Sequence, residues 1–107
     1  MVAGPERYPD RDYIVDTLID AMCDIGPERI LSGDTGDVCM VVGEVIGPTG
    51  MYTRYYPEQK YGNGAVLRRD LSMIQQSSHM LVFDPDSPDV KDIMYYADRY
   101  HLSIIEA

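Results

Sequence analysis

The segment from Ile30 to Val38, which reads ILSGDTGDV, constrains the fold more than any other part of the chain. A short apolar run ends in a glycine-containing turn, and a helix-like pattern begins at once. Such strand–turn–helix joins hold phosphates and ribose rings in α/β folds, because helix N-terminal N–H groups point at the ligand. Gly33 and Gly36 allow positive φ and leave no Cβ between the backbone and a bound group. The segment therefore predicts a binding edge, without identifying its ligand.

The charge balance narrows the class of partner. The chain has 107 residues, of which 45% are hydrophobic, and this predicts a single domain over residues 1–107. It carries 18 acidic residues against 9 basic ones, which gives a net charge of −9. Because so acidic a surface repels nucleic-acid phosphates and anionic lipids, we expect no direct nucleic-acid binding and no membrane association.

The cysteines and the chain start predict a cytoplasmic protein without a metal. Cys23 and Cys39 both lie in apolar helical patterns, and neither belongs to a Cys/His cluster, so two buried, reduced thiols are expected. His79 and His101 have no partner at metal-ligand spacing. No run approaches the ~18 apolar residues of a membrane span, and the first residues lack a signal-peptide pattern. We expect no metal and no cofactor.

Glycine, proline and capping residues divide the chain into alternating helices and strands. Asp10 or Asp12 can cap a first helix, and Gly26 followed by Pro27 ends it. Ser87, with proline after it, can cap the last helix. The expected helices cover about 10–25, 37–46, 64–77 and a segment after 87; the expected strands cover about 29–32, 51–56, 79–83 and 102–105.

This alternation predicts the fold class. Helices that separate strands form parallel βα units, and the sheet is then covered on both faces. The residues Met1-Val2-Ala3 can form the stub of one further strand. We therefore expect an α/β fold: a Rossmann-like parallel sheet of four to five strands with helices on both faces.

Four stretches together resemble the SLOG superfamily of small Rossmann-like domains, which includes DNA-processing proteins and cytokinin-activating phosphoribohydrolases. They are the opening strand and turn, a Gly-Gly-Ala-x-Gly-Ala-Asp-like turn, a Gly-Pro-x-Arg-Asn-like helix start and a Ser-x-Gly-Thr-like loop: residues 2–11, 32–38, 64–73 and 84–90. The resemblance implies a nucleotide-derived or ribosyl-containing ligand at the carboxyl ends of the strands. In the last loop Asp89-Val90 replaces Gly-Thr, which adds negative charge near the position of a phosphate. The signature of the phosphoribohydrolases is absent.

The candidate ligand-binding residues follow from these turns. Binding would use backbone N–H groups at helix starts together with one or two arginines. Arg68 or Arg69 can instead pair with local carboxylates such as Asp70, while Asp37 and Ser87 can simply cap helices. The candidates are Gly4, Arg7, Gly33, Asp34, Thr35, Gly36, Arg68, Arg69, Asp84 and Ser87.

Three functions remain open at this point. The first is a domain that senses or sequesters a nucleotide-like small molecule. The second is a nucleoside or nucleotide hydrolase or transferase with Asp34, Asp84 or Asp86 as general base or nucleophile. The third is an acidic, phage-encoded scaffold that binds a protein partner and no ligand. Two groups of tyrosines, Tyr52 to Tyr61 and Tyr95 to Tyr100, can stack on a base or line the interface of a homodimer.

Overall fold

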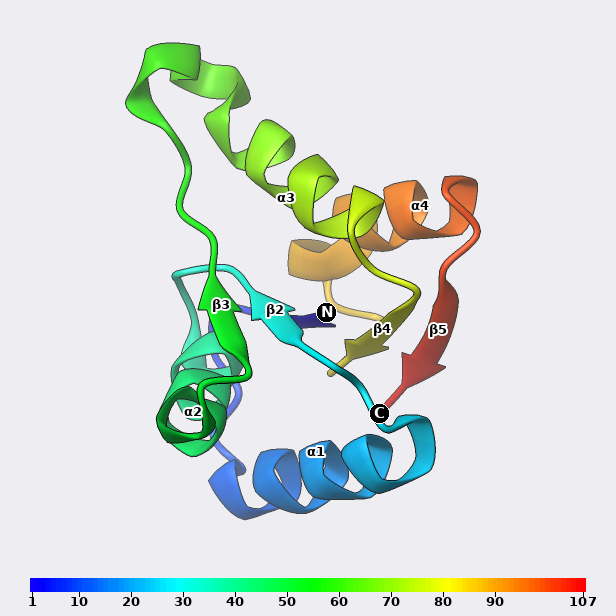
Figure 1. Cartoon of the computed structure of the whole chain (residues 1–107). Helices are drawn as coiled ribbons and strands as arrows, with labels where there is room; N and C mark the ends of the chain where they lie inside the picture. The colour runs from blue at the N-terminus through cyan, green and yellow to red at the C-terminus, as the bar shows by residue number, and fades with distance from the viewer.

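Helices and strands alternate along the whole chain (Figure 1). The structure is a computed structural model that describes all 107 residues. The strands are β1 (Val2–Ala3), β2 (Ile30–Ser32), β3 (Tyr52–Arg54), β4 (His79–Val82) and β5 (Ser103–Glu106). The α-helices are α1 (Arg11–Ile25), α2 (Asp37–Ile46), α3 (Ala65–Gln75) and α4 (Lys91–Arg99), and the short 3₁₀ helices are η1 (Gly47–Thr49), η2 (Gln59–Gly64) and η3 (Pro88–Val90).

The five strands form two parallel sheets. One has the order β1-β4-β5 and the other pairs β2 with β3. The α/β class and the short first strand are confirmed, whereas one continuous sheet is not, because β1 and β2 contact each other without ladder hydrogen bonds. β1 has only two residues before Gly4 and Pro5, and Pro5 lacks an N–H. Few backbone groups are therefore left to pair β1 with a second neighbour.

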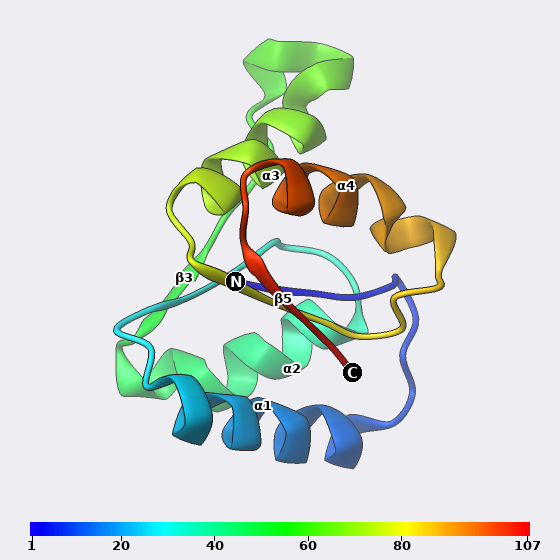
Figure 2. The ribbon, with the colours of Figure 1, turned by 90° about the vertical axis from the view of Figure 1, so that its right-hand side faces the viewer.

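Helices cover the strands from both sides, as predicted (Figures 1 and 2). Side chains alternate along β4 and just beyond it: Met80 and Val82 pack with α3 and α4, while Leu81 and Phe83 pack with α1 and α2. This divides the core into two clusters. The larger contains Val2, Ile14, Leu18, Ile30, Val38, Val41, Val42, Ile46, Leu81 and Phe83; the smaller contains Ala3, Ile74, Met80, Val82, Val90 and Ala97.

The helix ends confirm some capping predictions and correct one. The Asp10 carboxylate accepts the Tyr13 N–H at 3.1 Å, and Gly26 closes α1 in the left-handed conformation. The prediction that Asp37 caps α2 is wrong: Gly36, with φ 91°, is the N-cap residue, and the Asp37 carboxylate accepts the Tyr8 N–H at 2.7 Å. The carboxylate thus joins two loops instead of closing its own helix.

Two further features differ from what the sequence predicts. Both cysteines are free, but Cys23 is exposed and only Cys39 is buried. The segment expected to be a loop forms η2, and together with the start of α3 it extends away from the sheets (Figure 1). We call residues 55–67 the projecting arm, and it exposes Tyr56, Tyr61 and Leu67. No helix of the structure has both the length and the apolar character needed to cross a membrane.

Candidate functional site

A cavity of about 340 Å³ opens at the carboxyl ends of β1 and β2; we call it the carboxyl-edge cavity. Four predicted residues meet there, Gly4 after β1, Gly33 and Thr35 after β2, and Arg69 from α3. The far wall comes from the start of α4 and the loop before it. The volume lies within the ~300–1,000 Å³ typical of small-molecule sites.

Arg69 joins the β2–α2 turn to α3 at this cavity through two ion pairs, with Asp34 and Asp70. Its Nη1 donates to Asp34 Oδ1 at 2.7 Å, and its Nε and Nη2 both lie 3.0 Å from Asp70 Oδ1. The Arg69 side chain is only 12% exposed. The predicted alternative of a pair with Asp70 is therefore confirmed, and Asp34 is a second partner. Burial raises the pKa of Asp70 above its ordinary value, although the Arg69 guanidinium opposes that rise.

The glycines of the turns make room for the protein's own atoms. A Cβ at Gly4 would lie 2.5 Å from Val38 Cγ2, and a Cβ at Gly33 would lie 3.1 Å from Arg69 Cζ. A Cβ at Gly36 would lie 3.2 Å from the Pro5 oxygen. Close internal packing thus occupies the space that the sequence interpretation gave to a bound group.

The loops around the cavity are joined by carboxylates that accept backbone N–H groups. Asp89 Oδ2 accepts the Glu6 N–H at 3.0 Å, and Asp37 Oδ2 accepts the Tyr8 N–H. The Asp37 N–H in turn donates to the Glu6 oxygen at 3.1 Å. The β1–α1 loop is therefore fixed to the start of α2 and to η3.

Arg68 and Arg69, adjacent in sequence, lie in different surroundings. The Arg68 guanidinium carbon lies 4.3 Å from the centre of the Tyr61 ring, a cation–π distance. Both border a separate groove of about 310 Å³ on the projecting arm, together with Tyr55 and Tyr56. Arg69 lines this groove and the carboxyl-edge cavity, and so forms the wall between them.

The other predicted residues lie outside the cavity. Ser87 accepts the Asp89 N–H at 3.2 Å and caps η3, which directly precedes α4; the predicted cap of the last helix is therefore one turn early, because the N-cap residue of α4 is Val90. Asp84 is exposed and has φ 51°, in the left-handed region, while Asp86 and Arg7 are exposed on the same edge of the molecule. Ligand contact stays a prediction for all ten candidate residues, inside and outside the cavity.

The acidic character of the cavity was only partly indicated by the sequence. Glu6, Asp70, Asp89 and Asp92 line it, against the single cation Arg69. The sequence interpretation singled out Asp70 and Asp89 but missed Glu6 and Asp92. Cys39 also borders the cavity, and burial raises the pKa of its thiol. No group of three or more His, Cys, Asp and Glu side chains is arranged to hold a metal ion.

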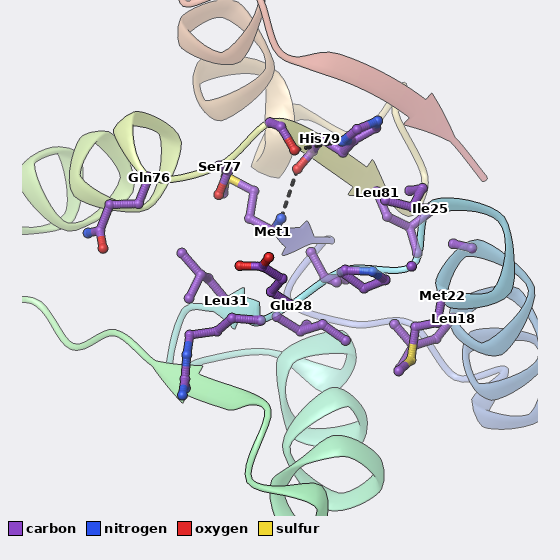
Figure 3. A pocket seen from close by; sticks show the side chains of 17 residues that line it. Met1, Leu18, Met22, Ile25, Glu28, Leu31, Gln76, Ser77, His79 and Leu81 are labelled. Carbon is purple, nitrogen blue, oxygen red and sulfur yellow. Dashed lines mark hydrogen bonds between the residues drawn. The ribbon is translucent and has the colours of Figure 1, made fainter.

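A larger cavity, of about 450 Å³, lies at the amino ends of the strands (Figure 3). Apolar side chains such as Leu18, Met22 and Leu81 line it, and the Met1 amine donates to the His79 carbonyl oxygen at 2.8 Å within it. None of the predicted residues lies there. Ligands of parallel α/β sheets bind at the carboxyl ends of the strands, where helices begin, so the carboxyl-edge cavity is the candidate site.

Comparisons of the chain with protein-family models, with curated protein sequences and with solved structures give no match.

Proposed function

We propose that this protein is a SLOG-like, Rossmann-like domain that binds a nucleotide-derived or ribosyl-containing small molecule in the carboxyl-edge cavity, to sense or sequester it. One observation carries the proposal: a single cavity of ligand size is bordered by predicted residues from three separate parts of the sequence, namely Gly4, the turn with Gly33 and Thr35, and Arg69. The cavity also lies at the edge of the strands that the motif resemblance indicates.

The strand arrangement supports this location. Taken as one sheet, the two sheets have the order β3-β2-β1-β4-β5, because β2 lies beside β1 (Figure 1). This is the order of doubly wound folds, in which ligands bind where successive strands turn to opposite sides of β1. The cavity lies at that point, since Gly4 follows β1 and Asp89 follows β4.

The cavity offers hydrogen-bonding groups for a sugar. Asp70 receives both Arg69 contacts at Oδ1, so its Oδ2 is free to accept from a ligand hydroxyl. That oxygen is not fully buried, because every fully buried side-chain oxygen or nitrogen has a hydrogen-bond partner. Thr35 is exposed at the opening and adds a hydroxyl that can donate or accept.

The carboxylates proposed for catalysis lend less support to a hydrolase or transferase. Asp34 is bound by Arg69, and Asp84 and Asp86 do not line the cavity.

The proposal includes a cytoplasmic location, which the two free thiols fit. It also includes a homodimer, which the exposed tyrosines of the projecting arm would help to form.

Thermal denaturation with nucleosides, ribose and ADP-ribose tests the proposal. A compound at 100 times its Kd stabilises the folded chain by about 2.7 kcal/mol, which raises Tm by several degrees. Val66 lines the cavity and is 51% exposed, so a larger side chain at this position can fill the cavity. Val66→Trp should therefore abolish the rise in Tm.

The matched control is Leu67→Trp, at the next position of α3. Leu67 is 41% exposed and does not line the cavity, so this variant should keep the full rise in Tm. If no compound shifts Tm, the small-molecule proposal is wrong. If Val66→Trp keeps the shift, the ligand binds elsewhere.

A further inference from the structure

We infer that the carboxyl-edge cavity accepts nucleosides and rejects their 5′-phosphates, because the protein's own carboxylates line it and already accept hydrogen bonds from the β1–α1 loop and from Arg69. This inference rests on the proposed function and narrows its ligand class. Three features of the cavity carry it: the β1–α1 loop, Arg69 and the charge of the lining.

The β1–α1 loop has few free backbone donors. Phosphate sites at such loops depend on N–H groups that point at the anion. Here Pro5 and Pro9 have no N–H, and the Glu6 and Tyr8 N–H groups donate to carboxylate oxygens of Asp89 and Asp37. The two carboxylates thus act as internal anions on this loop. A phosphate would have to displace them.

Arg69 is likewise engaged. Its Nε, Nη1 and Nη2 all contact Asp34 or Asp70, so one cation faces two carboxylates. The guanidinium lies against Gly33 and is largely buried. A phosphate that recruited Arg69 would leave Asp34 or Asp70 partly buried without its cation, which is strongly unfavourable. Arg69 thus uses three of its five N–H donors on these two carboxylates, and their charges offset its own.

The negative charge of the cavity lining also disfavours a phosphate. Glu6, Asp70, Asp89 and Asp92 surround a space that has one arginine. A phosphate dianion placed among them is repelled. A neutral nucleoside avoids this repulsion, and its ribose hydroxyls can donate to the same carboxylates.

Isothermal titration calorimetry with adenosine, guanosine, cytidine and uridine, each beside its 5′-monophosphate, tests the inference. We expect at least one nucleoside to bind and its monophosphate to bind about tenfold more weakly or worse. Asp89→Asn keeps an oxygen that can accept the Glu6 N–H but removes the charge, so the discrimination should fall by about threefold or more. Asp92→Asn, at a residue with no hydrogen-bonding role in the structure, should act in the same direction if Asp89→Asn fails to fold.

The matched control is Asp86→Asn, which removes the same charge from an exposed position outside the cavity and should leave the discrimination unchanged. Equal binding of a nucleoside and its monophosphate would overturn the inference and leave the proposed function standing. Equal effects of all three variants would also overturn it, because the selection would then come from the general charge of the chain. If neither series binds, the inference fails, and the proposed function is then decided by the thermal denaturation with ribose and ADP-ribose.

Discussion

At the scale of single residues, Gly4 has a packing role that its place in a turn did not reveal. An added Cβ would lie 2.9 Å from Val38 Cβ and 2.5 Å from Val38 Cγ2. Val38 is 1% exposed, and its β-branched side chain is fixed within α2, so it cannot move aside. We expect Gly4→Ala to lower the free energy of unfolding by about 1–3 kcal/mol, measured by urea denaturation.

The control for this substitution is Gly47→Ala. No atom lies within 4 Å of a Cβ built on Gly47, and its φ of −48° suits alanine, so stability should be unchanged or slightly higher. In a double-mutant cycle, Val38→Ala should relieve part of the cost of Gly4→Ala. Strictly additive losses would show that the contact between the two residues is not the cause.

The sequence predicts the hydrogen-bond or ion-pair role of a residue correctly where its partner lies nearby in the sequence. Asp10 and Ser87 cap their own helices, and Arg69 pairs with the adjacent Asp70. The carboxylates that join loops could not be read this way, because Asp37 meets Tyr8 from 29 residues away and Asp89 meets Glu6 from 83. A carboxylate before a helix has the same sequence pattern whether it caps that helix or binds a distant loop.

At the scale of elements, α1 has one unusual feature, a row of like charges. Asp12, Asp16, Asp20 and Asp24 are all exposed and recur every four residues, so they lie on one face of the helix. Like charges at this spacing destabilise a helix, and the last turn has no basic residue to complement the helix dipole. Asp20→Lys should therefore raise the free energy of unfolding by about 0.5–1 kcal/mol, by pairing with Asp16 and Asp24.

Salt dependence and position separate this effect from general charge reduction. The gain from Asp20→Lys should shrink at high salt, which screens exposed charges. Asp12→Lys makes the same change in charge, but it places a cation in the first turn, where the dipole opposes it, so we expect little or no gain. Equal stabilisation by both variants would point to the net charge of −9 as the cause.

The elements themselves were largely predictable, whereas their pairing was not. Apolar runs bounded by glycine, proline and capping residues located the four helices and five strands to within a few residues. The division into two sheets depends on how far the backbones of β1 and β2 lie from ladder geometry, and no local pattern encodes that distance. The 3₁₀ turns of η2 were also missed, because its polar, glycine-rich sequence is equally typical of an irregular loop.

At the scale of the whole molecule, the start of the chain is tied to the central strand of the larger sheet. The Met1 amine donates to the His79 carbonyl oxygen at the edge of the larger cavity (Figure 3). The Met1 carbonyl oxygen accepts the Leu81 N–H. Burial lowers the pKa of this amine from 8.0 to about 6, because a charged ammonium loses hydration there. The folding equilibrium is therefore linked to the protonation of this one group.

The sign of the linkage follows from which state binds more protons. Between pH 6 and 8 the amine of the unfolded chain is protonated more fully than that of the folded chain, so stability should rise with pH across this window. A two-unit shift corresponds to about 2.7 kcal/mol, which the partial exposure of the amine reduces to about 1–2 kcal/mol. Urea denaturation at several pH values measures the rise. An N-terminally acetylated chain keeps an N–H for His79 but cannot titrate, so it should show a smaller rise. Identical profiles for the two chains would assign the pH dependence to other groups.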